Sequence, residues 1–203
     1  MIAYLLQGLT LGFSAAVSPG PFQAYLLSQA LKSGGRRAVR ITLAPLVSDG
    51  PIIALVLTAL TQTPDWFLRA LQIAGGLFLL YLAYGAYSTF KTFNAIMPVV
   101  ADSARGSFFK GVAMNTLSPG PYVFWSVLAG PILLKGWAES PSLGLSFAIG
   151  FYLTMITALA ALIILFATAS RLGPRVTRAL NGLSALALLL FGLYQLWQGV
   201  VGA

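Results

Sequence analysis

Two identical tetrapeptides and one acidic residue carry the chemistry that this sequence offers. Ser18-Pro19-Gly20-Pro21 recurs 100 residues later as Ser118-Pro119-Gly120-Pro121, and Asp49 lies between the two copies. Each proline removes a backbone donor and clashes with the preceding turn, so an α-helix must break at each copy. The first N–H groups after a break attract carboxylates, and the carbonyl groups freed before it suit an ammonium group or a cation. The two breaks predict a site for a zwitterion, and a simple hinge without a ligand is the alternative.

Asp49 is the one acidic residue inside an apolar run that is long enough to cross a membrane. The other three acids, Asp65, Asp102 and Glu139, fall in loops or at the ends of such runs. A carboxylate within a membrane is costly and is by default a candidate functional group. We expect Asp49 to carry a coupling proton, to bind a substrate ammonium group, or to alternate between both. A purely structural Asp49, satisfied by helix N-termini or by hydroxyls such as Ser48, is the alternative.

Three further side chains lie within one helical turn of a break. Asn115 precedes the second break and either hydrogen-bonds a substrate or caps the second half-helix. Tyr25 and Trp125 follow the two breaks and can line a pocket, although core packing explains either ring alone. The predicted substrate-binding residues are therefore Ser18, Pro19, Gly20, Pro21, Tyr25, Asn115, Ser118, Pro119, Gly120, Pro121 and Trp125.

The composition places these residues in an integral membrane protein. Of the 203 residues, 58% are hydrophobic and only 8% are charged, and the mean hydropathy is +0.87. Soluble domains carry about a quarter charged residues. The chain has no cysteine and no histidine, so thiol chemistry and the usual zinc ligand sets are excluded. No paired carboxylates or known catalytic motif occur, and we expect no enzyme activity, no cofactor and no resident metal.

Six apolar runs predict six transmembrane helices, of which the first and the fourth contain the breaks. The predicted spans are 2–31, 41–60, 66–90, 108–134, 142–169 and 179–201. Ten of the twelve basic residues fall in the loops 32–40, 91–110 and 170–178, and only Arg69 and Lys135 lie elsewhere. Since basic loops stay in the cytoplasm, both termini should lie outside. The net charge of +8 is thus a mark of membrane topology, and no nucleic-acid partner is expected.

Each half of the chain contributes three spans, so the second half must start on the opposite side of the membrane and the two halves must have inverted topology. We expect an all-α membrane protein of two inverted three-helix repeats, 1–95 and 108–203, joined by a cytoplasmic linker at 96–107. Matching broken helices in two such repeats are the pattern of a secondary transporter, with the substrate at the level of the breaks. Gly8, Gly12 and Ala16 recur every four residues, a spacing that serves helix packing within the chain or a homodimer.

At these residues the chain resembles the lysine-exporter (LysE) family, which includes homoserine and threonine exporters of the RhtB type, over essentially its whole length. The resemblance rests on Gly12-Phe13 with Pro19-Gly20-Pro21, the basic loop from Lys32 to Arg37, Asp49, and the third helix ending near Tyr84-Gly85. The family's usual Asn-Pro motif with a following lysine is replaced by Ser118–Pro121, which indicates a divergent branch. The resemblance implies an exporter of amino acids or related small solutes driven by the proton motive force, in a prokaryotic inner membrane.

The expected function is therefore proton-coupled export of a small zwitterion by alternating access, with protons, membrane lipids and an amino-acid-like substrate as partners. A divalent-metal or cation exporter of a related family is the first alternative, but it needs more ligands than one aspartate. A membrane enzyme or electron carrier and a non-transporting membrane protein are the others. The latter predicts that Asp49→Asn leaves every phenotype intact.

Overall fold

The computed structural model describes residues 1–58, 65–91, 103–169 and 173–201, and every regular element in these ranges is helical. The elements are α1 (Ile2–Val17), α2 (Pro21–Ser33), α3 (Gly35–Ala38), the 3-10 helix η1 (Val39–Leu43), α4 (Ala44–Thr58), α5 (Asp65–Lys91), α6 (Ala104–Leu117), α7 (Pro119–Val123), the π-helix η2 (Phe124–Ala129), α8 (Gly130–Glu139), α9 (Pro141–Ala169) and α10 (Pro174–Val201). The predicted all-α architecture is confirmed.

The lengths and hydropathies of these helices account for up to six membrane spans. Four stretches, Gly35–Thr58, Asp65–Ser88, Pro141–Ala169 and Pro174–Val201, are long and apolar enough by themselves. Two bent pairs of helices, Ile2–Val17 with Pro21–Ser33 and Ala104–Leu117 with Pro119–Glu139, bring the number to six when each pair is one span. The second span begins at Gly35, earlier than predicted. The predicted linker 96–107 lies partly outside the described residues, and α6 already starts within it.

The first and fourth spans break where the prolines predict. The bend is 65° between α1 and α2 and 56° between α6 and the stretch that begins at Pro119. Ser18 and Ser118 both have extended backbone angles. Each serine hydroxyl donates to the carbonyl oxygen four residues earlier, Ser14 and Met114 respectively, at 2.7 Å. The two breaks therefore share their local structure as well as their sequence.

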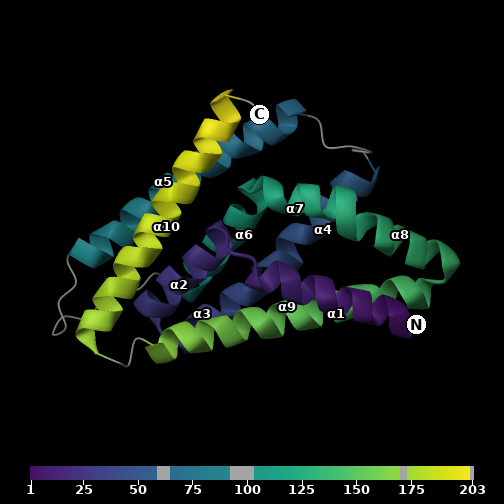
Figure 1. The fold of residues 1–203 in the computed structure, drawn as a ribbon, viewed down its shortest axis with the longest axis horizontal. Helices are drawn as coiled ribbons and strands as arrows, with labels where there is room; N and C mark the ends of the chain where they lie inside the picture. Colours follow the sequence, from purple (N-terminus) through teal and green to yellow (C-terminus); the bar gives the residue numbers. More distant parts are fainter. Residues whose placement is uncertain (59–64, 92–102, 170–172, 202–203) are drawn as a thin grey trace.

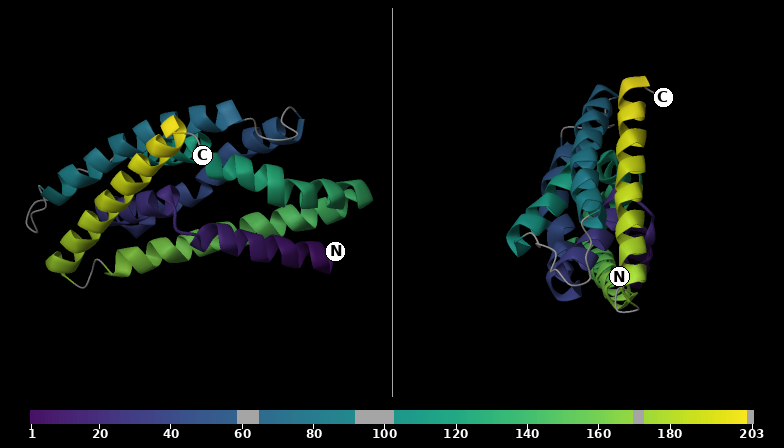
Figure 2. Two further views of the ribbon diagram at one scale, coloured as in Figure 1. Left: turned by 45° about the horizontal axis from the view of Figure 1, so that its top comes forward. Right: turned by 90° about the vertical axis from the view of Figure 1, so that its left-hand side faces the viewer.

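The pattern of neighbours relates the two halves of the chain. The half-helix before the first break, α1, packs along α9, and the half-helix before the second break, α6, packs on α4. The third and sixth spans, α5 and α10, lie side by side (Figures 1 and 2). Each half-helix before a break therefore packs on a helix of the other half of the chain, as expected for an inverted repeat. The repeat boundaries at 1–95 and 108–203 stay a prediction.

Glycines allow the closest helix contacts. A methyl group on Gly8 or Gly12 of α1 would overlap the backbone of Phe147 or Phe151 on α9. At the crossing of α5 and α10, Cβ atoms on Gly76 and Gly192 would each lie 3.0–3.2 Å from the other glycine's carbonyl oxygen. The small-residue stripe of α1 thus serves packing within one chain, and a homodimer stays a prediction.

The molecule presents an apolar surface and holds polar groups inside, as expected for a protein in a bilayer. Long stretches of α9 and α10 expose leucine and isoleucine, including Leu145, Ile149, Leu153, Ile164, Leu165, Leu183, Leu186 and Leu190. The buried polar residues are Ser28, Gln29, Thr42, Ser48, Asp49, Ser107, Asn181, Ser184 and Gln195. At these positions the interior contains hydrogen-bonding groups as well as packed apolar side chains.

Candidate functional site

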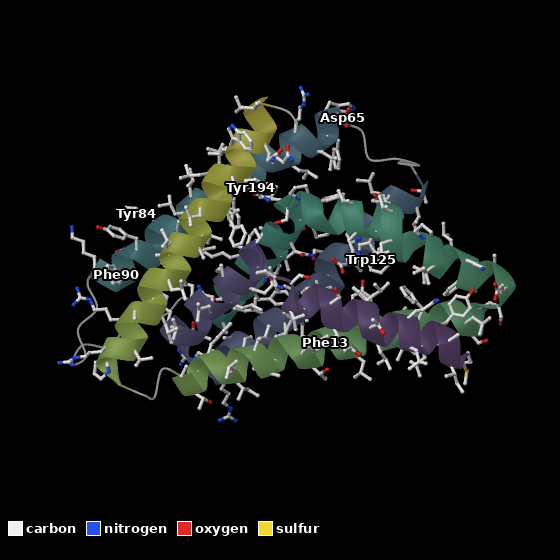
Figure 3. The ribbon with its side chains drawn as sticks, viewed as in Figure 1. Phe13, Asp65, Tyr84, Phe90, Trp125 and Tyr194 are labelled. Atoms are coloured by element: carbon white, nitrogen blue, oxygen red, sulfur yellow. The ribbon has the colours of Figure 1, made fainter. Side chains whose placement is uncertain are left out.

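A cavity of about 590 Å³ lies where both breaks meet Asp49. Both tetrapeptides line it, as do Asp49, Asn115 and Trp125, so the cavity brings together every predicted site residue except Tyr25. Its other walls come from α5, α9 and α10 and are formed by Gln72, Phe151, Met155, Leu159, Phe191, Tyr194, Gln195 and Gln198. In Figure 3, Trp125 and Tyr194 lie toward the middle of the molecule, whereas Tyr84 lies on the far side of α5 and is 75% exposed. The volume is typical of a small-molecule site.

Side chains that follow each break cap the carbonyl groups that precede it. Gln23 Nε2 donates to the carbonyl oxygens of Ala15 and Ala16 at 3.2 and 3.0 Å. In the second half, the Tyr122 hydroxyl donates to the Thr116 carbonyl oxygen at 2.9 Å. Several of the carbonyl groups expected to be free for a cation are therefore already satisfied within the protein.

In contrast to these carbonyl groups, the first N–H groups after the first break have no acceptor within their own helix. Helix α2 begins at Pro21, which has no N–H, and its first backbone bond within the turn runs from Ala24 N to the Gly20 carbonyl oxygen. The N–H groups of Phe22 and Gln23 belong to the first turn, where a helix offers no intrahelical acceptor. Both residues line the cavity, so that the positive end of the α2 dipole faces it.

Asp49 lies at the centre of a hydrogen-bond network that joins three elements. The residue is on α4 and 4% exposed. Its Oδ1 accepts from Asn115 Nδ2 of α6 at 2.8 Å, and its Oδ2 accepts from the Tyr152 hydroxyl of α9 at 3.3 Å. Both donors are neutral, and through Asp49 they tie α4 to α6 and α9.

Asn115 has a role that neither of the two sequence interpretations described. Its Nδ2 also donates to Ser48 Oγ at 2.7 Å, so that Asn115 spans two neighbouring residues of α4. Ser48 itself donates to the Ala44 carbonyl oxygen at 3.1 Å rather than to Asp49. Asn115 therefore anchors Asp49 to the end of the half-helix just before the second break.

A π-helix brings Trp125 to the cavity. In η2 the N–H of Gly130 bonds to the Trp125 carbonyl oxygen, five residues earlier, which widens the turn. Such π segments inside helices are often found at functional sites. The Trp125 ring is 1% exposed and packs edge-on against Phe151 at 5.3 Å and stacks on Tyr152 at 6.4 Å between centroids. Trp125 is thus both a packed core residue and a cavity wall.

Tyr25 is the one predicted residue that lies outside the cavity lining. Its side chain is 1% exposed and its hydroxyl donates to the Ser107 carbonyl oxygen at 2.9 Å. Ser107 Oγ in turn donates to Gln29 Oε1 at 2.9 Å. Tyr25 therefore cross-links α2 to Ser107 near the start of α6, which agrees with the core-packing alternative, and a pocket role for it stays a prediction.

Sequence reasoning missed Tyr152 and the glutamines Gln72, Gln195 and Gln198. Tyr152 lies in the 29-residue apolar helix α9, whose composition carries no sign of which face meets the site. The glutamines did carry a signal, because amide side chains are rare inside membrane spans and face the protein interior. Within the described ranges, no group of three or more His, Cys, Asp or Glu side chains could hold a metal ion.

One comparison with known proteins found a match. A model of the LysE type translocator family matches residues 13–199, which is most of the chain. No curated protein and no solved structure matches it.

Proposed function

Because the chain belongs to the LysE type translocator family, and is therefore a multi-pass membrane transporter of small solutes, we propose that it exports amino acids or similar zwitterions by proton-coupled alternating access. The observation that carries the proposal is the cavity itself, where two helix breaks and the one intramembrane carboxylate meet. We assign the protein to a prokaryotic inner membrane with both termini outside, in agreement with its basic loops.

The substrate carboxylate is held at the breaks. The N–H groups of Phe22 and Gln23 in the first turn of α2, together with the start of the helical stretch Pro119–Glu139, present partial positive charge to the cavity. An anion there replaces the missing acceptors of the first turn. In the low dielectric of a membrane interior, this attraction is stronger than it is in water.

Asp49 carries the coupling proton in this proposal. Both of its oxygens accept hydrogen bonds from neutral donors, which supports an ionised carboxylate in this conformation. A proton on Asp49 removes the charge that strengthens these bonds. The ties from α4 to α6 and α9 then weaken, which frees the two halves to move against each other.

The hydrogen bonds suggest which side is closed in this conformation. The cavity extends to Gln72 near the start of α5 and to Gln198 near the end of α10. The start of α5 and the end of α10 are the predicted outer ends of these two helices. On the predicted inner side, Tyr25, Gln29 and Ser107 join α2 to α6. We interpret this conformation as open toward the outside, with the α2–α6 cross-link as the inner gate.

The test is uptake of a panel of labelled amino acids into proteoliposomes under an imposed pH gradient. The wild type should transport some of them only while the gradient lasts, and Asp49→Asn should abolish this dependence. Asp65→Asn is the matched control, because it removes an identical charge from the first turn of α5, outside the cavity lining. Failure of a folded wild-type protein to transport any amino acid would reject the substrate class, whereas gradient-driven transport by Asp49→Asn would reject the coupling residue.

A further inference from the structure

The carboxamide of Gln195 differs from the other polar groups around the cavity. Gln195 lies on α10, is 8% exposed and lines the cavity. Its Oε1 is the one buried side-chain oxygen or nitrogen in the described part of the chain that has no hydrogen-bond partner. An unpaired buried acceptor is costly, and native proteins seldom keep one without a reason. The unpaired oxygen indicates a donor that arrives with a ligand.

A second oxygen converges on the same point because residue 75 is glycine. A Cβ atom on Gly75 of α5 would lie 2.9 Å from Gln195 Oε1 and would overlap the Leu117 carbonyl oxygen. In a continuous helix, that carbonyl would accept from residue 121, but Pro121 has no N–H. Leu117 precedes Ser118, which lines the cavity. Three spans thus contribute to a small electronegative site beside the second break.

The chemistry of this site suits an N–H donor better than a metal ion. Two neutral oxygens are too few for Ca²⁺ or Mg²⁺, which take six or more oxygen ligands. They do suit an ammonium group, which brings several N–H donors of its own. Each oxygen of Asp49 already accepts a hydrogen bond from a neighbouring side chain, Asn115 or Tyr152, whereas Gln195 Oε1 has no donor in the described part of the chain.

We propose that Gln195 Oε1, together with the Leu117 carbonyl oxygen, binds the ammonium group of the transported zwitterion and makes the protein selective for substrates with a free amine. This inference rests on the proposed function and deepens it. The breaks hold the carboxylate, Gln195 holds the amine, and Asp49 is left to carry the proton. Gly75 is a positioning residue, since any side chain there would drive the two oxygens apart.

The first test compares an α-amino acid with the carboxylic acid that lacks its amino group, as substrates of the reconstituted protein. Gln195→Leu should reduce the preference for the amine about tenfold or more, the effect of losing a hydrogen bond to a charged donor. Gln195→Glu should keep the preference, because glutamate retains the acceptor oxygen but loses the N–H donors. Gln198→Leu is the matched control, since Gln198 lines the same cavity but donates to the Tyr194 hydroxyl.

The opposite pattern identifies a structural role for the same side chain. If the Gln195 amide only ties α10 to α6 by donating to the Leu117 carbonyl, then Gln195→Leu and Gln195→Glu both lower the melting temperature and both keep the amine preference. That result overturns the ammonium subsite and leaves the proposed amino-acid transport standing.

A second test does not depend on transport. The chain has no native cysteine, so Gln72→Cys places a single thiol on the cavity wall, three residues before Gly75 on α5. Methylammonium should slow modification of this thiol, and tetramethylammonium, which has no N–H, should not. The protection should disappear in the Gln72→Cys/Gln195→Leu double variant. Equal rates with and without methylammonium would refute the subsite. Protection by methylammonium in a protein that transports no amino acid would instead support the amine subsite and refute the proposed substrate class.

Discussion

Replacing Gly150 with alanine should push α1 away from α9 and destabilise the protein. A Cβ atom there would lie 2.8 Å from the Leu5 carbonyl oxygen, 3.1 Å from Leu5 Cδ1 and 3.3 Å from Leu9 N. Real Cβ atoms essentially never lie closer than 3.0 Å to such an atom, and ordinary van der Waals contact begins at 3.4 Å. The Leu5 carbonyl must therefore move by at least about 0.2 Å, and by about 0.6 Å to restore ordinary contact. Two of the three atoms belong to the backbone and cannot rotate away. Overpacking of this kind costs about 1–3 kcal/mol.

Thermal unfolding in detergent measures this cost. For a chain of this size, 1 kcal/mol corresponds to roughly 2–4 °C in melting temperature, so Gly150→Ala should melt several degrees below the wild type. Gly85→Ala is the matched control, because a Cβ atom on Gly85 of α5 meets no atom within 4 Å and alanine favours the helix. If Gly150→Ala melts at or above the temperature of Gly85→Ala, the close contact of α1 and α9 does not exist as described.

The remaining predictions concern the site and the topology. Asn115→Ala should raise uptake without a pH gradient about tenfold or more, because the tie from α6 to Asp49, worth about 1.5–3 kcal/mol when the aspartate is charged, is then missing in both charge states; unchanged gradient dependence of the initial uptake rate in proteoliposomes would contradict the network. Tyr25→Phe removes the donor to the Ser107 carbonyl oxygen. It should therefore increase the labelling of a cysteine in the cavity by a reagent added on the cytoplasmic side. Unaltered labelling would exclude an inner gate there. In intact cells, Ser140→Cys should react with an impermeant thiol reagent and Ser33→Cys should not; the reverse would invert the predicted orientation.

The two helix breaks and their position close to Asp49 could be predicted from the sequence alone. Proline acts on the backbone wherever it lies, so each tetrapeptide had to interrupt its helix. Asp49 and both breaks lie about 8 to 12 residues along the chain from the nearest basic residue of a loop, which predicts a similar depth for all three at about 1.5 Å per helical residue. An inverted arrangement then brings both breaks to one level, and the cavity contains both.

The partners of Asp49 could not be predicted in the same way. Whether Asn115 faces a substrate, its own helix or α4 depends on the rotation of α6 about its axis, which nothing in the local sequence sets. Tyr152 meets Asp49 through the packing of α9, whose Tyr152 ring also stacks on Trp125 of the π-helix, and such long-range packing cannot be read from the local sequence. For the same reason, the sequence could not decide between a pocket and core packing for Tyr25, since one turn of spacing fixes its height along the helix but not its direction.

The central claim is that export is coupled to protons through Asp49, and proton movement during substrate efflux tests it most directly. Proteoliposomes loaded with a transported amino acid and a pH-sensitive dye are diluted into substrate-free buffer. We predict that efflux through the wild type and through Asp65→Asn changes the pH of the lumen, and that Asp49→Asn produces no such change. Amino-acid efflux through the wild type without proton movement, or a full pH change with Asp49→Asn, would contradict the mechanism.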